Sequence, residues 1–255
     1  MMIYMFLGVM KHLSEKGHLT DIQEISCASC GSLIGLFFVL FAGDMDKICQ
    51  LAFDSSLGTA SKADVKTFIN KFGFINASKI EKLIIEKLDG VDPTFKELYD
   101  MNPVKLHIST YEMLTGRTIY MSVDTTPDMK VTRAIRRSIS IPIVFTPCIE
   151  DGCVYLDGST VEVSPYAPFL GKNDVVELRW RRNPVLKTVP KNVTQFIKTF
   201  IFSFFESYRI GNEYTGFDRI DVYSSNDSLS YDFNMSYENK ILLFNEGYSQ
   251  VKLLE

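Results

Sequence analysis

A run of small and apolar residues constrains the fold more than any other part of the chain; it reads Glu24-Ile-Ser-Cys-Ala-Ser-Cys-Gly-Ser-Leu-Ile-Gly35. Its pattern predicts a short strand over residues 22–27 that passes through a tight turn into a long apolar helix over residues 30–42. Ser29 lies on that turn, directly before the helix. A serine held on so sharp a strand-to-helix turn has the geometry of a nucleophile elbow, usually written G-x-S-x-G.

The residues on either side of Ser29 decide how well it fits this pattern. Gly31 occupies the second glycine position, whereas Cys27 replaces the first glycine. Both positions require small side chains because bulky ones would collide across the turn, and cysteine is small enough to fit. Backbone N–H groups and the positive end of the helix dipole can stabilise an oxyanion beside Ser29. An ordinary buried strand, turn and helix with a serine in the turn remains the alternative at this point.

Composition limits the classes of partner and cofactor. The 255 residues suffice for one domain with a large core, and 46% of them are hydrophobic. A formal net charge of −4 leaves no basic surplus for phosphates, which argues against a nucleic-acid partner. The five cysteines form no disulfide framework, and the single C-x-x-C of Cys27 and Cys30 has no second ligand pair. We therefore expect no metal or redox site and a reducing compartment.

Residues 25–43 carry no charge, which raises the question of a membrane span. Only residues 33–42 are continuously apolar, so a helix buried inside an α/β domain fits better. We find no basic leader followed by an apolar region and a cleavage site. The expectation is an intracellular, cytoplasmic protein, either in solution or peripheral at a membrane surface.

Helices and strands are predicted to alternate along the chain, which favours a largely parallel sheet covered by helices on both faces. Thr94 and Glu97 have the spacing of a capping box and should begin a short helix. Asp151-Gly152 is a strong hairpin turn. The other predicted helices cover residues 4–16, 46–53, 61–71, 78–88, 128–137, 192–209 and 236–254, and the other strands cover 104–110, 118–123, 153–156, 175–180 and 218–223.

A nucleophilic serine needs a base, and the usual histidine is difficult to find here. No histidine follows His107, which lies in the middle of an alternating strand and is typical of a core position. An aspartate can serve if it lies within hydrogen-bond reach of the serine. Asp157 is the best candidate, because it ends an apolar strand and is followed by Gly158. A plain Asp-Gly turn is the alternative interpretation.

Several motifs taken together resemble the patatin-like phospholipase family over most of the chain. The family's first helix is similar to Gly8-Val-Met-Lys-His-Leu-Ser-Glu-Lys-Gly17, and its elbow helix to Gly31-Ser-Leu-Ile-Gly35. The stretch Arg133-Ala-Ile-Arg-Arg-Ser-Ile-Ser-Ile-Pro-Ile-Val-Phe-Thr-Pro147 looks like the one that precedes the catalytic aspartate. Tyr155-Leu-Asp-Gly158 with Pro165 resembles the family's D-G-[AG] motif and trailing proline, with Ser159 in the third position.

The resemblance implies a three-layer α/β/α fold and a lipid acyl hydrolase with a Ser–Asp dyad. Ser29 would be the nucleophile, Asp157 the base, and the backbone N–H of Cys30 an oxyanion donor. Such chemistry would require no metal and no organic cofactor. The substrates would be phospholipids or neutral glycerolipids, reached by transient contact with a membrane surface. We expect one domain over residues 1–255, with a core over about 3–170 and strand–helix elements over about 171–255. The Phe-rich residues 196–205 are interpreted either as a lipid-reaching surface or as a core helix.

The sequence departs from the family at its start. Patatin-like enzymes carry a Gly-rich loop, G-G-G-x-[RK]-G, after their first strand, and its N–H groups form most of the oxyanion hole. Here Met1 stands where that loop should be ending. One interpretation is that translation starts further upstream; the other is a catalytically impaired lipid-binding or scaffold protein of the same fold. A thioesterase-like hydrolase that uses His107, and a protein anchored by residues 33–42, are the remaining alternatives.

Overall fold

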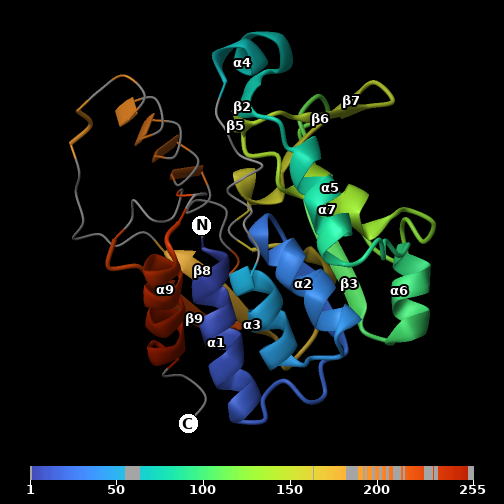
Figure 1. Ribbon diagram of the computed structural model, residues 1–255. Helices are drawn as coiled ribbons and strands as arrows, with labels where there is room; N and C mark the ends of the chain where they lie inside the picture. The colour runs from blue at the N-terminus through green and yellow to red at the C-terminus, as the bar shows by residue number, and fades with distance from the viewer. Residues whose placement is uncertain are drawn as a thin grey trace.

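A computed structural model gives the fold of the chain (Figure 1). The structure describes residues 2–54, 64–162, 164–181, 189–191, 193, 195–196, 199–200, 203–204, 207–208, 214, 216–226, 232 and 235–251. Helices and strands alternate within these ranges, which confirms the predicted α/β class. No helix in the described ranges combines the length and the apolar character that crossing a membrane requires.

The first three elements form as the sequence predicts. Helix α1 (Ile3–Glu15) is followed by strand β1 (Glu24–Cys27), and α2 (Cys30–Leu40) begins directly after the turn that holds Ser29. Every residue of α2 from Ser32 to Val39 is buried. A helix that is apolar all round belongs in the interior of a protein, so α2 is the buried central helix that the uncharged run predicted.

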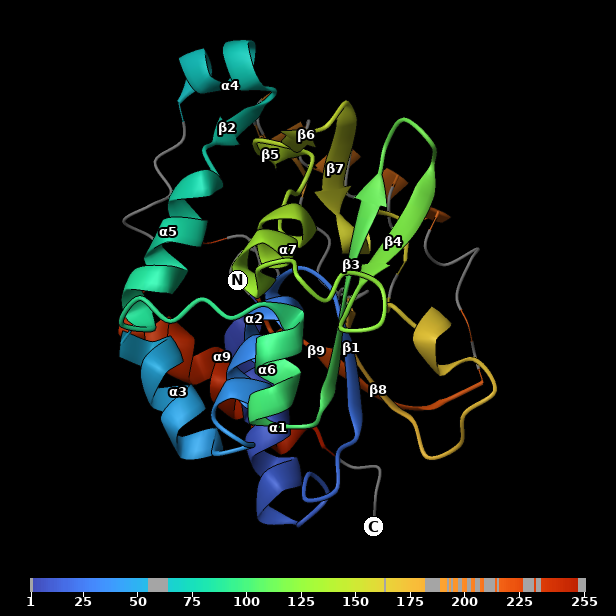
Figure 2. The ribbon, with the colours of Figure 1, turned by 90° about the vertical axis from the view of Figure 1, so that its right-hand side faces the viewer.

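The main sheet is built around β3 (Lys105–Glu112), which pairs with three other strands. β1 runs parallel to β3, whereas β4 (Arg117–Met121) and β7 (Cys153–Asp157) run antiparallel to it. The predicted hairpin across Asp151-Gly152 joins β6 (Cys148–Glu150) to β7. Helices α2, α6 (Phe95–Met101) and α7 (Val131–Ser138) lie on the same side of β1 and β3 (Figure 2).

The registers bring the carboxyl ends of β1 and β7 together. Ile108 of β3 pairs with Cys27 and with Met121, and Thr110 pairs with Asp157 and with Ile119 of β4. Since β4 occupies one edge of β3 over this stretch, β1 and β7 must share the other edge, one after the other. β1 runs along that edge towards Thr110 and β7 runs towards Ile108. The chain therefore leaves both strands at nearly the same point.

The sheet is more mixed than the mainly parallel one that the alternation predicted. The pairings among the described residues are parallel for β1–β3, β2–β5 and β8–β9, and antiparallel for β3–β4, β3–β7 and β6–β7. The parallel pair of β2 (Gly73–Ile75) and β5 (Ile143–Phe145) was not predicted, because three residues are too few to show a strand period.

Helices α3 (Met45–Asp54), α4 (Val65–Lys71) and α5 (Ser78–Lys87) connect the first layer to the sheet, and α6 begins with the predicted capping box of Thr94 and Glu97. Residues 61–63, where the predicted start of α4 falls, lie outside the described residues. Two short 3₁₀ turns, η2 (Gly158–Thr160) and η3 (Ala167–Phe169), follow β7.

The last part of the chain forms a separate strand pair and a closing helix. β8 (Val176–Arg181) runs parallel to β9 (Asp218–Tyr223), and α9 (Tyr237–Ser249) lies along α1 (Figure 1). The two helices meet where each has a glycine. A Cβ on Gly8 would lie 2.0 Å from the carbonyl oxygen of Phe244, and one on Gly247 would lie 2.0 Å from that of Met5. Only glycine allows this approach.

Helical residues occur in the predicted helix over residues 192–209, and those the structure describes are 193, 195–196, 199–200, 203–204 and 207–208. The interpretation of this segment as a core helix is wrong for the described aromatic residues. Phe196, Phe200 and Phe204 are 60%, 62% and 66% exposed, because this helix presents them to solvent and not to the sheet.

Candidate active site

Ser29 has the backbone strain expected of a nucleophile elbow. Its φ is 53° and its ψ is −129°, and it is the residue directly before the first turn of α2. Residues other than glycine rarely adopt a positive φ, and such strain is concentrated at functional sites, where surrounding contacts maintain it. An ordinary strand–turn–helix connection needs no such conformation. The geometry therefore favours the elbow over the alternative of a plain turn.

One hydrogen bond from a distant segment and two local ones hold the elbow in place. The N–H of Ser29 donates to Oγ of Ser138, at the end of α7, over 2.9 Å. The hydroxyl of Ser32 donates to the carbonyl of Ser29, and the N–H of Gly31 donates to the carbonyl of Ala28 over 2.9 Å. Because Ser138 is fully buried, its hydroxyl is not exchanged for water, and the turn is fixed from outside its own segment.

The structure explains how Cys27 replaces the usual glycine. Its thiol turns away from the elbow and donates to the carbonyl of His107 over 3.4 Å. The sulfur packs against Gly35 of α2, where an added Cβ would lie only 3.0 Å from it. On the elbow side, a Cβ on Gly31 would meet the Cβ of Cys27 at 3.6 Å, an ordinary contact. Cys27 is thus accommodated because Gly35, one helical turn further on, leaves room for its sulfur.

Asp157 ends β7 and is only 3% exposed. Its Oδ1 accepts hydrogen bonds from the N–H of Ser159 over 2.8 Å and from the hydroxyl of Ser159 over 2.6 Å. Its own N–H donates to the carbonyl of Ser140 over 3.0 Å. Gly158 is required next to it, because a Cβ there would lie 2.4 Å from Oγ of Ser109 on β3. A buried strand end packed this closely is not a plain exposed turn.

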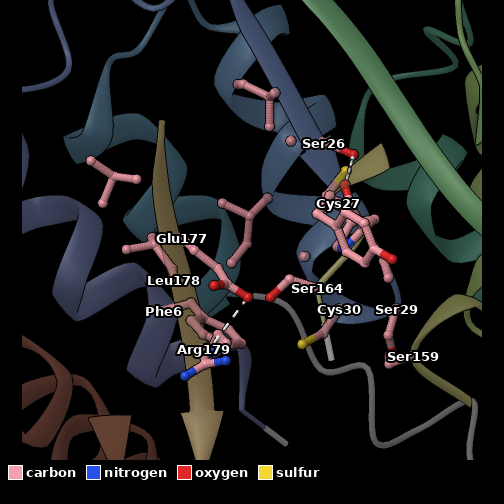
Figure 3. A pocket seen from close by; sticks show the side chains of 18 of the residues that line it. Phe6, Ser26, Cys27, Ser29, Cys30, Ser159, Ser164, Glu177, Leu178 and Arg179 are labelled. Atoms are coloured by element: carbon pink, nitrogen blue, oxygen red, sulfur yellow. Dashed lines mark hydrogen bonds and ion pairs between the residues drawn. The ribbon is translucent and has the colours of Figure 1, made fainter. Parts of the chain in front are cut away.

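One cavity of about 990 Å³ contains both predicted residues in its wall. Its lining includes Ser29, Cys30, Asp157 and Ser159, together with many apolar side chains, among them Phe6, Leu33, Phe38, Ile139 and Phe145. Figure 3 shows Ser29, Cys30 and Ser159 on one side of this space and Glu177, Leu178 and Arg179 of β8 on the other. The cavity thus lies between the elbow and β8.

The cysteine next to Ser29 is not a competing nucleophile. Burial, and the negative charge of Asp157 nearby, raise the pKa of the Cys30 thiol to about 12. Burial also raises the pKa of the Cys27 thiol. Both thiols are therefore protonated at neutral pH, and a thiol is a much weaker nucleophile than a thiolate. The charge of Asp157 thus acts on the thiol of the residue that follows Ser29.

His107 does not take part in the wall of this cavity as far as the described residues define it. Its Nε2 lies 3.2 Å from Oε2 of Glu24, and burial lowers its pKa although the hydrogen bond with Glu24 opposes this. The ring edge packs against Phe169. His107 is thus a buried histidine with partners of its own, as the sequence predicted. A thioesterase-like site that uses this residue has no support in the geometry.

The described residues contain no group of three or more His, Cys, Asp or Glu side chains arranged to hold a metal ion. Three serines near the site were not predicted as functional: Ser138, Ser140 and Ser159. The first two lie in the quoted segment before Asp157, and a hydrophobic pattern gives no reason to single them out. The sequence indicates only that Ser159 is a small residue in the third position of the Asp-Gly motif. In the structure its hydroxyl contacts the Asp157 carboxylate directly.

The fold and site define an α/β protein with a strained serine elbow and a buried aspartate in the wall of one apolar cavity. The sequence profile of the patatin-like phospholipase family matches residues 1–170, two thirds of the chain. The chain belongs to this family. Membership assigns it to a family of lipid hydrolases, which confirms the resemblance on which the elbow and the Asp-Gly motif were interpreted.

Individual proteins agree with this assignment. The chain is 30% identical over 145 residues to the uncharacterized protein R571 of Acanthamoeba polyphaga mimivirus. The matched region covers 54% of this chain and 47% of that protein. It is 28% identical over 170 residues to the uncharacterized NTE family protein Rv1063c of Mycobacterium tuberculosis. Here the matched region covers 67% of this chain and 43% of that protein. The chain thus spans less than half the length of these relatives.

The crystal structure of VipD from Legionella pneumophila has a similar fold. The two superpose with a TM-score of 0.52 at 14% sequence identity, over 98% of this chain and 64% of that one. At this identity the likeness concerns the fold alone. It confirms the predicted α/β/α architecture of the patatin-like family.

Proposed function

We propose that the chain is a lipid acyl hydrolase in which Ser29 is the nucleophile and Asp157 the general base. The observation that carries the proposal is the strained φ of 53° at Ser29, in the wall of the cavity that also contains the buried Asp157. The meeting of β1 and β7 on one edge of β3 accounts for their proximity. Family membership supports the reaction class.

The proposed reaction has two halves. Oγ of Ser29 attacks the ester carbonyl and passes its proton to the carboxylate of Asp157. The tetrahedral oxyanion is stabilised by the backbone N–H of Cys30 and by the positive end of the dipole of α2. Collapse forms the acyl-enzyme and releases the alcohol, which takes the proton from Asp157. Asp157 then accepts a proton from water, whose oxygen attacks the acyl-enzyme. Collapse releases the fatty acid, and the proton on Asp157 passes to Oγ of Ser29, which restores both residues.

The apolar wall of the cavity supports a lipid substrate. A volume of about 990 Å³ suits a drug-sized or larger apolar ligand, and side chains such as Phe38 and Phe145 offer it no charge. The wall also carries charged side chains, among them Glu177 and Arg179 of β8, which lie across the cavity from the elbow where an ester would react. We propose that phospholipids or neutral glycerolipids bind with an acyl chain along this wall. We also propose that residues 1–255 work as one unit, because α9 packs against α1 next to the elbow layer.

The test is covalent labelling by a fluorophosphonate, which reacts only with an activated serine. We expect the wild-type chain to be labelled and to release fatty acid from a phospholipid. Ser29→Ala should abolish both, and Asp157→Asn should slow labelling by about a hundred- to ten-thousand-fold because the base is lost. The control is His107→Ala, which should leave labelling within a few-fold of wild type. Folded wild-type protein that is never labelled would contradict the enzyme and leave the lipid-binding alternative.

A further inference from the structure

A row of exposed apolar side chains runs along the described part of the segment between β8 and β9. Val193, Phe196, Phe200, Phe204 and Tyr208 are all helical and more than half exposed. They are spaced three or four residues apart, so they share one face of the helix. We call these five residues the aromatic row.

Two side chains of the row are in direct contact. The rings of Phe196 and Phe200 stack with their centroids 6.3 Å apart and their planes 16° from parallel. In Figure 1 the orange fragments of this helix stand apart from the strands and from α1 and α9. Single exposed apolar residues are common on soluble proteins, but a contiguous aromatic face on a surface element indicates an interaction site.

The charge around the row indicates the kind of partner. Residues 182–209 contain five basic side chains, Arg182, Lys187, Lys191, Lys198 and Arg209, and one acidic side chain, Glu206. The chain as a whole carries a net charge of −4, so this segment differs in sign from the rest. Aromatic residues on one face of a helix together with a basic surplus are typical of helices that lie in the surface of an anionic membrane.

The segment that carries the row begins and ends at the cavity. Arg181, the last residue of β8, lines the cavity, and so does Phe217 directly before β9. Within the segment, the ring of Tyr214 stacks on that of Tyr166 at 5.1 Å and 13°, and it contacts Phe217 at 4.7 Å. Tyr166 also lines the cavity. A surface bound by the row would therefore be connected, through both ends of this segment, to the wall of the cavity that contains Ser29.

We propose that the aromatic row docks the protein on an anionic lipid membrane. The rings enter the interface between headgroups and acyl chains, and the positive net charge of residues 182–209 attracts the protein to the negative headgroups. This docking deepens the proposed function and rests on it in one respect only, the reason for docking. The docked protein takes its lipid substrate from the membrane that it covers. Docking itself involves no catalysis, so it is measured on a protein that cannot hydrolyse its ligand.

The experiment is vesicle co-sedimentation in the Ser29→Ala background, with vesicles of phosphatidylcholine alone and of phosphatidylcholine mixed with phosphatidylserine. We expect binding to the mixed vesicles that weakens as salt is added. The variant Phe196→Ser/Phe200→Ser/Phe204→Ser should bind at least about tenfold more weakly, because it loses three interfacial rings. The matched control is Val65→Ser/Ile69→Ser/Leu114→Ser, whose side chains are 63%, 68% and 63% exposed at other places.

Two results would overturn the proposal. One is equal vesicle binding by the row variant and the wild type, with both shown to be folded by circular dichroism. The other is a dimer, measured by light scattering without lipid, that the row variant converts to a monomer while vesicle binding is unchanged; the row would then bind a second copy. Fluorophosphonate labelling in solution separates the two proposals. A wild-type chain that is not labelled but binds vesicles through the row would contradict only the hydrolase.

Discussion

Hydrogen bonds from a few serines determine where the proposed nucleophile and base stand. The hydroxyl of Ser138 accepts from the N–H of Ser29, and the backbone carbonyl of Ser140, two residues later, accepts from the N–H of Asp157. One short segment at the end of α7 thus fixes the backbone of both residues. Ser159 adds a hydroxyl to the Asp157 carboxylate. Since a dyad works only when its atoms are held close to the reactive geometry, we interpret these serines as positioning residues.

Ser159→Ala tests this interpretation at the carboxylate. The variant removes a 2.6 Å hydrogen bond to Oδ1 of Asp157 but keeps the one from the backbone N–H. A hydrogen bond to a charged group contributes about 1.5–3 kcal/mol, so we expect labelling of Ser29 to slow by about ten- to a hundred-fold. The loss also favours the protonated carboxyl, which should move the acidic limb of the pH–rate profile to higher pH.

The measurement is the labelling rate of Ser29 as a function of pH for the wild type, Ser159→Ala and Ser159→Thr. The threonine variant keeps the hydroxyl and should restore both the rate and the acidic limb. A uniform loss of rate with an unchanged profile in Ser159→Ala would mean that the residue acts only through the structure of the loop.

The contact between α1 and α9 depends on two glycines. Gly8 and Gly247 each let the backbone of the facing helix approach to a distance at which a Cβ would collide with a carbonyl oxygen. The side chains around them, such as Tyr4 and Phe244 with Phe53, form an aromatic cluster that joins α1, α3 and α9. Because the clash would involve backbone atoms, no side-chain rotation can relieve it.

We therefore expect Gly247→Ala to separate the two helices and to lower the free energy of unfolding by about 1–3 kcal/mol. The intrinsic helix propensity of alanine works in the opposite direction, by about 1 kcal/mol, so the sign of the effect reports on packing. Urea unfolding followed by circular dichroism measures it. The control is Asn245→Ala, an exposed position on the same helix. A stabilised Gly247→Ala variant would show that the helices do not approach this closely.

Elements with a strong local signal could be predicted from the sequence, and elements that depend on distant partners could not. The periodicity of α1, the capping box of α6 and the turn at Asp151-Gly152 are local, and all three are confirmed. β2 and β5 exist because they pair with each other across some 70 residues, which no local pattern indicates. The helix predicted over residues 192–209 is confirmed for its described residues, but the sequence left open whether its phenylalanines face the core, and the structure exposes Phe196, Phe200 and Phe204.

The same distinction holds for the site within the whole molecule. Ser29 and Asp157 could be selected from the sequence because each follows a strand end and carries a motif of small residues. That β1 and β7 approach each other along one edge of β3 is a property of the register, and the sequence contains no sign of it. Ser138 was missed for the same reason, since its partner Ser29 lies 109 residues away.

The attachment of β7 to the β3–β4 hairpin depends on one buried carboxylate, that of Glu112. Its Oε2 accepts from the hydroxyl and the N–H of Thr115, and its Oε1 accepts from the N–H groups of Leu114 and Val154. The hydrogen bond from the Thr115 hydroxyl is the main cause that lowers the pKa of Glu112 to about 2, and the backbone N–H groups add to it. The carboxylate thus joins the hairpin turn to the strand that ends at Asp157.

This carboxylate makes the stability of the whole fold depend on pH in a stated direction. An unfolded glutamate titrates near pH 4.3, whereas the folded one stays ionised down to about pH 2, so the unfolded chain binds the extra proton between these values. The contribution of Glu112 is therefore complete above about pH 5 and is lost as the pH falls towards 2. Replacing it by glutamine removes the charge at every pH and puts an NH2 donor in place of one of the two accepting oxygens, so that some of the N–H groups lose their acceptor.

We expect Glu112→Gln to be less stable than the wild type at pH 7 and the difference to shrink steadily as the pH is lowered from 5 to 2. Urea unfolding at a series of pH values measures the free energy of both proteins, and Glu86→Gln, at an exposed position of α5, is the control. If the free energies of unfolding of Glu112→Gln and wild type changed in parallel with pH, the turn would not lower the pKa of Glu112 as described. Because β7 carries Asp157, the converging curves should be matched by weaker fluorophosphonate labelling in Glu112→Gln at neutral pH, which ties the stability of this hairpin to the geometry of the site.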